Sequence, residues 1–323
     1  MDKQLACRLA RASRLAYAIP ETGQTLKPYP ELDHDLQSVG FKPDEFKFFR
    51  PTAAGNINAC YCGVTTINET ILAFRGTLPP TLIFQDPAKF FQVVIDDWLN
   101  DANAALVTGT DLPGKVHRGF LASLDTLWPE LLAFFKASHD KTKPLYVTGH
   151  SKGGGLAFLA AYRLWKNNFG PTAIYTFAAP RVGDPGFAAL FDDKLGSITF
   201  RFEYQDDIVP HLPPHTAAWI EFLKGMKVVK IKLPFDDGQL DSNFTRLIDR
   251  IAKLKEEGFG NYTSAGRLEF INWDDPPNIQ SESPSLTRFR EFHLAEMIIT
   301  AQAVEIIKDH FLDRGYMTFA CHS

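Results

Sequence analysis

The chain has 323 residues, of which 45% are hydrophobic and 22% are charged, and its formal net charge is −4. This is the composition of a globular protein, and the charge gives no reason to expect a nucleic-acid partner. No run approaches the roughly 18 apolar residues that a membrane-spanning helix needs. The first ten residues lack the continuous apolar stretch of a signal peptide, so the sequence leaves the localisation unknown.

The predicted elements alternate between helix and strand along one domain, residues 1–323. The first 17 residues have the amphipathic pattern of a helix. The elements predicted after it are strands at 59–66, 69–74, 145–148, 173–177, 198–202 and 268–272, and helices at 120–135, 156–165, 246–255 and 294–307. Such alternation predicts βαβ units and a largely parallel sheet. Residues 216–262 have the character of an insertion, and 273–285 that of a Pro-rich loop.

The four cysteines are too few and too scattered for a disulfide framework. They are Cys7, Cys60, Cys62 and Cys321. Free thiols are therefore the default expectation, and a link between Cys7 and Cys321 stays open without support. Cys60 and Cys62 share one face of a predicted strand, but no second pair exists to build a zinc site. We expect neither a metal nor an organic cofactor.

The most informative motif is Gly149-His150-Ser151-Lys152-Gly153. It lies between a short apolar strand and a helical pattern, which is the context of a nucleophile elbow rather than of a chance G-x-S-x-G. A serine at such a turn projects from the carboxyl edge of the sheet, over the positive end of the next helix. The alternative is a glycine-rich loop with an idle serine. The strand, the turn and the helix together favour Ser151 as a nucleophile.

A nucleophilic serine needs a base, and the base needs an acid that orients it. The order expected for this kind of sheet is serine, acid, histidine. Asp206 and Asp207 directly follow the strand at 198–202, so both are candidates for the acid. One of the two must then have another role, such as fixing the loop.

The histidines that follow these acids are His211, His215, His293, His310 and His322. The first two lie too close to Asp207, and His322 is at the chain end. His293 comes after the last strand and next to a helix, where a loop carrying the base belongs. His310 lies near the far end of that helix, where a cation would complement the helix dipole. The placement favours His293 over His310.

The oxyanion formed by the attacked carbonyl needs two N–H donors. One is expected from Lys152, the residue after the serine. The other is expected from Thr77, at the end of the strand 69–74, which could add its hydroxyl. An ordinary turn at 75–77 is the alternative.

Five blocks in order resemble the class 3 lipase family, whose members are α/β-hydrolases. They are Phe74-Arg75-Gly76-Thr77, Val116-His117-Arg118-Gly119-Phe120, the serine motif, Thr176-Phe177-Ala178-Ala179-Pro180-Arg181-Val182-Gly183-Asp184, and Asp207-Ile208-Val209-Pro210-His211-Leu212-Pro213-Pro214. The resemblance implies an α/β-hydrolase fold, with a mostly parallel sheet, helices on both faces and a lid. It also implies that Asp207 is the acid, because the family's acid directly precedes x-V-P. Lys152 and Ala178 depart from the family's usual residues.

In this family a lid follows the oxyanion block, which here places it at 78–95. Its large apolar side chains would be costly in water, so a lid that closes inward or lies on lipid is expected. A loop packed into the core is the alternative.

The sequence thus predicts a serine ester hydrolase, most consistent with a triacylglycerol lipase that acts at an oil–water interface. Ser151, Asp207 and His293 form the expected triad, and Thr77 and Lys152 the oxyanion hole. A phospholipase A1, a carboxylesterase or a feruloyl esterase on the same scaffold is the nearest alternative. A lipase-like binding protein without activity is the alternative from another class. The oligomeric state stays open.

Overall fold

The structure is a computed structural model that describes residues 1–51, 58–77, 104–213, 261–299 and 308–321. All structural statements concern these ranges. The expected lid at 78–95 lies outside them, as do nearly all of the insertion at 216–262 and the helix expected within it at 246–255.

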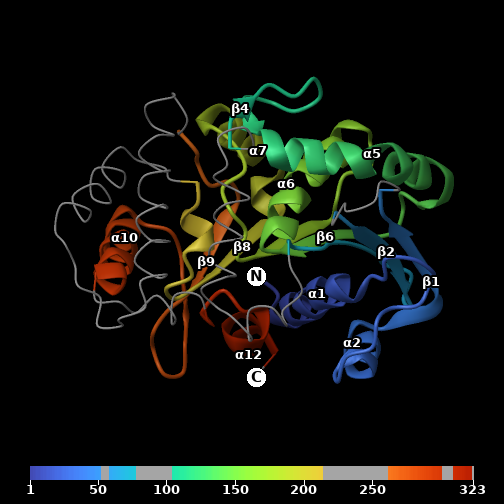
Figure 1. Cartoon of the computed structure of the whole chain (residues 1–323), viewed down its shortest axis with the longest axis horizontal. Coiled ribbons are helices and arrows are strands. Elements are labelled where there is room, and N and C mark those ends of the chain that lie inside the picture. Colours follow the sequence, from blue (N-terminus) through green and yellow to red (C-terminus); the bar gives the residue numbers. More distant parts are fainter. Residues whose placement is uncertain (52–57, 78–103, 214–260, 300–307, 322–323) are drawn as a thin grey trace, which may run out of the picture.

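An eight-stranded sheet lies at the centre of the molecule (Figure 1). Its strands, in spatial order, are β1 (Phe41–Phe49), β2 (Cys60–Thr65), β3 (Thr70–Phe74), β6 (Leu145–His150), β7 (Ala173–Phe177), β8 (Thr199–Tyr204), β9 (Arg267–Ile271) and β10 (Ile279–Gln280). The run from β3 to β9 is parallel, while β1, β2 and β10 pair antiparallel at the two sides. Parallel strands all end at one edge, so the loops after β3, β6 and β8 meet there.

Helices cover both faces of this sheet (Figure 1). The first face is covered by α5 (Arg118–Ser138), α6 (Lys152–Lys166) and α7 (Pro185–Leu195), and the second by α1 (Lys3–Leu15) and α12 (Met317–Cys321), with α2 (Leu32–Val39) packed on α1. The remaining elements are α10 (Pro284–Ile299), the short turns η1 (Ala16–Ala18), η2 (Gly196–Ile198), η3 (Val209–His211) and η4 (Leu312–Tyr316), and a small ribbon of β4 (Leu106–Val107) and β5 (Val116–His117). The predicted fold class, a mostly parallel sheet between helices, is confirmed.

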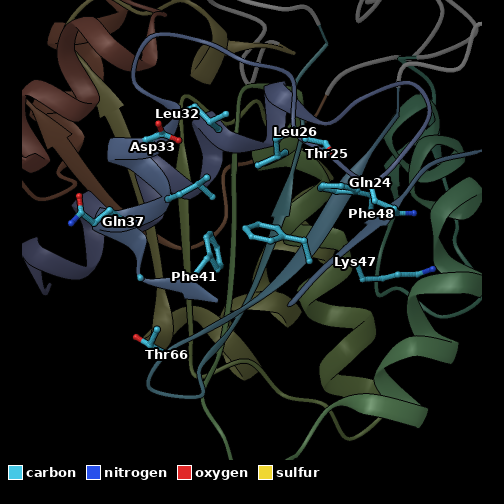
Figure 2. Close-up of a pocket in the computed structure, with 13 residues that line it drawn as sticks. Gln24, Thr25, Leu26, Leu32, Asp33, Gln37, Phe41, Lys47, Phe48 and Thr66 are labelled. Carbon is cyan, nitrogen blue, oxygen red and sulfur yellow. The ribbon is translucent and has the colours of Figure 1, made fainter. Parts of the chain in front are cut away.

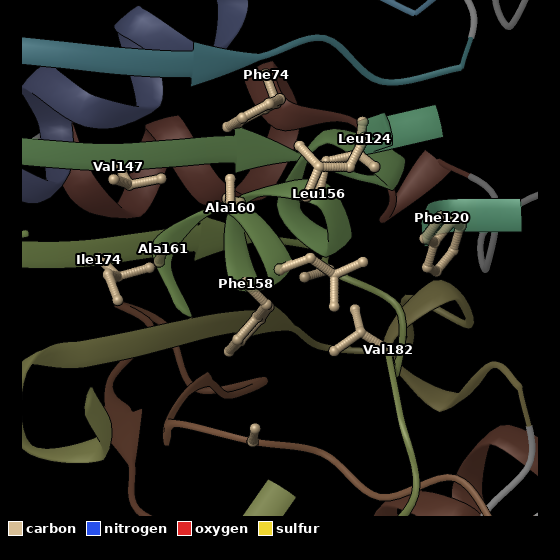
Figure 3. Packing of buried hydrophobic residues seen from close by; sticks show 14 of the residues in the cluster. Phe74, Phe120, Leu124, Val147, Leu156, Phe158, Ala160, Ala161, Ile174 and Val182 are labelled. Atoms are coloured by element: carbon tan, nitrogen blue, oxygen red, sulfur yellow. The ribbon is translucent and has the colours of Figure 1, made fainter. Parts of the chain in front are cut away.

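Each face of the sheet has its own apolar core because side chains alternate along a strand. On β2, Cys60 and Cys62 contribute to the core under α5 and α6, whereas Tyr61 contributes to the core under α1. The hydroxyl of Tyr61 donates to the carbonyl of Ala12, 2.8 Å away. Figure 3 shows the first core, to which Leu156 and Phe158 of α6 and Phe120 and Leu124 of α5 contribute. Two filled cores hold the parallel strands, and hence their carboxyl ends, in place.

Two of the differences from the expectation have a clear local reason. The last helix, expected from 294, begins at Pro284 because Ser283 caps it: the Leu286 N–H donates to the Ser283 hydroxyl at 3.1 Å. Proline suits the first turn of a helix, so the Ser-Pro pair starts a helix here instead of a loop. The strand β1, which was not among the predicted strands, contains Pro43 and lies at the sheet edge, where proline is tolerated.

The two ends of the described chain are joined by a disulfide between Cys7 and Cys321, whose Cα atoms are 4.8 Å apart. The expectation of free thiols is therefore wrong for this pair. It holds for Cys60 and Cys62, which are free and buried in β2. Among the described helices, none combines the length and the apolar character needed to cross a lipid bilayer.

Candidate active site

Ser151 stands at a sharp turn between β6 and α6, as the motif predicts. Its backbone has φ 60° and ψ −133°, a region that non-glycine residues rarely occupy. The turn is held because the Ser151 N–H donates to the carbonyl of Phe177 on the neighbouring strand, at 2.9 Å. The hydroxyl therefore sits at the carboxyl edge of the sheet, at the N-terminus of α6.

The glycines of the motif are required by close packing at this turn. A Cβ on Gly149 would lie 2.3 Å from the backbone of Gly153, and one on Gly153 would lie 2.2 Å from the carbonyl oxygen of Phe74. Real Cβ atoms do not approach backbone so closely, so either side chain would force β6, α6 and β3 apart. The G-x-S-x-G spacing is thus a packing requirement of the elbow.

The structure brings His310, not His293, to Ser151. The Ser151 hydroxyl donates to His310 Nε2 at 3.0 Å, and His310 Nδ1 lies 3.0 Å from both carboxylate oxygens of Asp207. A carboxylate only accepts, so Nδ1 carries the proton and Nε2 is left to accept from the serine. All three side chains are buried. One histidine joins Ser151 to Asp207, as expected. That histidine is His310, so the prediction that His293 has this position is wrong.

His293 instead hydrogen-bonds the other candidate acid, Asp206, through Nδ1 at 2.8 Å. It lies in the middle of α10 rather than in a loop, because that helix starts ten residues earlier than expected. His310 lies in a turn between α10 and η4, the kind of position that was assigned to His293. No local sequence pattern singles out His310, because its contacts with Ser151 and Asp207 join parts of the chain that are more than 100 residues apart.

Asp207 is held by donors from several directions. Besides His310, the Tyr316 hydroxyl donates to it at 2.6 Å and the Val209 N–H at 2.9 Å. Burial and the Asp207 charge together raise the pKa of Tyr316 well above its ordinary value, so this hydroxyl stays a donor. The carboxylate is consequently fixed in the orientation that His310 requires.

A second buried histidine supports the backbone of His310. His150 Nε2 donates to the carbonyl of His310 at 2.8 Å, which leaves His150 Nδ1 to accept from the Tyr17 hydroxyl, also at 2.8 Å. Burial, with repulsion from His310, lowers the pKa of His150 well below its ordinary value. A neutral imidazole has one N–H donor and one acceptor nitrogen. These are the two roles that His150 has between Tyr17 and the His310 carbonyl.

The pairing of the strands also explains where the loop expected to hold the oxyanion lies. Phe74, the last residue of β3, pairs with Gly149 of β6, so Thr77 comes from the strand next to the elbow. Thr77 is buried, and its hydroxyl has no hydrogen-bond partner in the described part of the chain. A Cβ on Gly76 would lie 2.1 Å from the Tyr17 hydroxyl, so this loop packs tightly on the same tyrosine. An unused buried hydroxyl at this edge is available to a ligand.

Lys152 occupies the first position of α6 and is buried. Its Nζ donates to the side-chain oxygen of Asn58 at 3.0 Å. The charged end of Lys152 is therefore tied to the segment before β2. Its backbone N–H, at the start of the helix, belongs to the group of amides that carry the positive end of the helix dipole.

A large pocket lies elsewhere, beside the edge strand β1 (Figure 2). Its volume is about 1040 Å³, and its walls come from residues 24–26, α2 and β1. Phe41 and Leu26 point into it, and none of its lining residues belongs to the group around Ser151. Within the described ranges, no cluster of three or more histidine, cysteine or acidic side chains could hold a metal ion.

Residues 72–217 match the family described as lipase (class 3). A secreted mono- and diacylglycerol lipase 1 of Fusarium solani is 33% identical over 175 residues, which are 51% of this chain and 49% of that protein. A phospholipase A1-II 4 of Oryza sativa subsp. japonica is 27% identical over 52% of this chain and 43% of that protein. The chain thus spans about half the length of these curated relatives.

A solved lipase structure from Rhizopus microsporus var. chinensis has the same fold. The likeness covers 98% of this chain and 89% of that one, with a TM-score of 0.56 and 20% sequence identity. At this identity the likeness concerns the fold alone.

Proposed function

We propose that the chain is a serine hydrolase of carboxylic esters, and the match of residues 72–217 to the class 3 lipase family supports this. The observation that carries the proposal is the continuous hydrogen-bonded line from Ser151 through His310 to Asp207. A serine hydroxyl is a weak nucleophile at neutral pH unless a base takes its proton. The Nε2 of His310, 3.0 Å from the Ser151 hydroxyl oxygen, lies where that base is needed.

In the proposed mechanism, Ser151 Oγ attacks the ester carbonyl while His310 Nε2 takes its proton. Asp207 accepts the Nδ1–H of His310 and stabilises the imidazolium that forms. The same Nε2–H then protonates the departing alcohol, which leaves an acyl group on Ser151. A water molecule, activated by His310, attacks this acyl-enzyme and releases the carboxylic acid.

The negative charge on the carbonyl oxygen is assigned to donors at the ends of β3 and β6. Thr77 would contribute its N–H and its unused hydroxyl, and Lys152 its backbone N–H. Each donor of this kind lowers the barrier by roughly 3–4 kcal/mol. The support is the pairing of β3 with β6, which places both residues at one edge, and the unpartnered buried hydroxyl of Thr77.

We propose acylglycerols as the substrate class, with triacylglycerols first. The apolar residues of the expected lid, 78–95, suit a lipid surface. The related mono- and diacylglycerol lipase supports an acylglycerol, and the related phospholipase A1 makes phospholipids the second candidate. A series of triacylglycerols, diacylglycerols, phospholipids and soluble p-nitrophenyl esters, each with and without an emulsion interface, separates these possibilities.

The test of the chemistry is Ser151→Ala. It should reduce p-nitrophenyl butyrate hydrolysis by at least about 10⁴-fold, because no other group can form the acyl-enzyme. Ser138→Ala, at the exposed end of α5, is the matched control and should leave activity unchanged. Wild-type protein should also be labelled by a fluorophosphonate at Ser151. Failure of both hydrolysis and labelling would instead indicate a lipase-like binding protein.

A further inference from the structure

Two histidine–carboxylate pairs lie side by side at the carboxyl edge of the sheet. Asp206 and Asp207 are consecutive, and each accepts a hydrogen bond from the Nδ1 of a different histidine. Asp207 faces His310, which belongs to the proposed mechanism. Asp206 faces His293, which comes from α10 and has no part in that mechanism. The second pair therefore needs its own explanation.

Both oxygens of the Asp206 carboxylate accept a hydrogen bond. Its Oδ1 accepts from His293 Nδ1 at 2.8 Å, and its Oδ2 accepts from Trp273 Nε1 at 2.9 Å. These donors come from two separate elements, α10 and the segment after β9. Asp206 is buried, and an ionised acceptor with two such donors makes strong, geometrically fixed bonds.

The ring of His293 is itself fixed by aromatic neighbours. It stacks on Phe289, one turn earlier in α10, with the centroids 5.8 Å apart and the planes at 19°. Trp273 meets it edge-on at 5.1 Å. His293 is thus oriented on two sides, and its side chain is about one-third exposed. Such an arrangement fixes the direction of the Nδ1–H bond to Asp206.

The position of Asp206 controls that of Asp207 because the two share a tight turn. Gln205 has a φ of 32°, and the Asp207 N–H donates back to the carbonyl of Tyr204 at 3.0 Å. The Asp206 N–H points to Asp309, the neighbour of His310, with 3.3 Å between its nitrogen and Oδ2. A shift of Asp206 would therefore be transmitted to both Asp207 and His310.

We propose that His293 is a positioning residue: its bond to Asp206 clamps the turn that presents Asp207 to His310. This inference rests on the proposed function of Ser151, His310 and Asp207. His293 touches neither the serine nor the substrate position in this scheme. It acts through Asp206, and α10 is the support that holds the acid loop.

Loss of the clamp should affect turnover more than substrate binding. A less fixed Asp207 orients the His310 imidazole less well, and small misplacements of this kind are costly in the chemical step. Removal of comparable supporting hydrogen bonds lowers activity by about 10–100-fold. We expect His293→Ala to lower kcat about 10-fold and to leave KM within about 2-fold of wild type.

The experiment compares His293→Ala with His293→Asn, because the side-chain amide of asparagine can place an N–H where Nδ1 lies. His34→Ala, an exposed histidine on α2, is the matched control. Turnover of p-nitrophenyl butyrate is expressed per serine labelled by a fluorophosphonate, so partly unfolded protein is not counted. The asparagine variant should recover most of the lost kcat, and the control should match wild type.

A double variant tests the route through Asp206. If the clamp is one unit, adding Asp206→Ala to His293→Ala should lower kcat little beyond the worse single variant. The proposal is overturned if His293→Ala keeps the wild-type kcat per labelled serine, if asparagine rescues nothing, or if the two losses multiply. An inactive and unlabelled wild type would contradict the proposed function instead, so the two failures can be told apart.

Discussion

At the scale of single residues, the acidic groups around His310 differ in their environment. Asp207 has strong donors on both oxygens, whereas Asp309 is buried, accepts from the Asp206 N–H at 3.3 Å and lies 3.9 Å from Arg314. Burial is the main reason that the pKa of Asp309 is raised to about 7, and repulsion from Asp206 and Asp207 adds to it. The charge of Asp309, which lies next to the site, is therefore expected to change near neutral pH.

This raised pKa predicts how stability depends on pH. Between about pH 4 and 7 the folded chain keeps a proton on Asp309 that the unfolded chain releases, so the free energy of unfolding falls as pH rises. Asp309→Asn removes this fall in the free energy of unfolding, because asparagine does not titrate. Relative to wild type, the variant should gain roughly 1–3 kcal/mol between pH 4.5 and pH 7.5. Urea unfolding at several pH values measures it.

The matched control for this titration is Asp33→Asn, an exposed acid at the start of α2. It should follow the pH dependence of wild type. Parallel stability curves for wild type and Asp309→Asn would show that Asp309 does not titrate in this range in the folded protein.

At the scale of elements, the elbow depends on three segments whose backbones pack directly against each other, with no side chain between them. The end of β3, the turn at Ser151 and the first turn of α6 meet at backbone distance, and Gly149 and Gly153 lie at the contacts. The strained backbone of Ser151 persists because these segments fix it on all sides. The position of Ser151 is consequently a property of the packing of β3 against α6.

Gly153→Ala tests this packing. Its new Cβ would lie 2.2 Å from the carbonyl oxygen of Phe74, so β3 and α6 must separate and Ser151 must move. We expect ester hydrolysis to fall at least about 100-fold and unfolding to become easier by about 1–3 kcal/mol. Kinetic assays and urea unfolding give the two values.

Gly170→Ala serves as the comparison, since its Cβ would meet Trp165 at an ordinary contact distance of 3.7 Å. It should retain wild-type activity. Unchanged activity in Gly153→Ala would contradict the account of the elbow.

At the scale of the whole molecule, the two ends of the described chain join the same layer. The helices α1 and α12 pack together on the second face of the sheet, and the Cys7–Cys321 disulfide links them (Figure 1). The residues that precede α12 include His310 and Tyr316, both of which contact Asp207. The layer that joins the ends therefore also supports the site.

The disulfide spans 314 positions and so restricts nearly the whole unfolded chain. Replacing both residues, Cys7→Ser with Cys321→Ser, should lower the free energy of unfolding by about 2–4 kcal/mol. Denatured wild-type protein without reductant should show two reactive thiols, those of Cys60 and Cys62. A count of four, or an unchanged urea midpoint in the double variant, would contradict the linkage.

Several features could be predicted from the sequence because they are local. The parallel strands, the turn at Asn68 and the elbow at Ser151 follow from apolar runs, a turn and glycines within a few residues of each other. The family resemblance rested on the same kind of short blocks, and residues 72–217 match that family. The candidates for the acid that orients the histidine were limited to the consecutive residues Asp206 and Asp207 for the same reason.

The partner of Ser151 could not be chosen in this way. His293 and His310 lie 142 and 159 residues after Ser151, and both are followed or preceded by helical patterns. Because α10 starts at Pro284, His293 lies within this helix, whereas His310 lies in a turn. Tyr316 and His150 then fixed His310 through contacts between distant parts of the chain.

The sequence by itself predicted the fold class, the resemblance to class 3 lipases and the sharp turn at Ser151, since strand pattern and close-packed glycines act over a few residues. Only the tertiary structure decided that Asp207 faces His310, that Asp206 faces His293, and that Cys7 meets Cys321. The physical reason is that these pairings depend on how α1 and α12 pack on one face of the sheet and on how α10 meets the loop after β8. No local pattern encodes that packing, because it is set by the burial of surfaces from both ends of the chain.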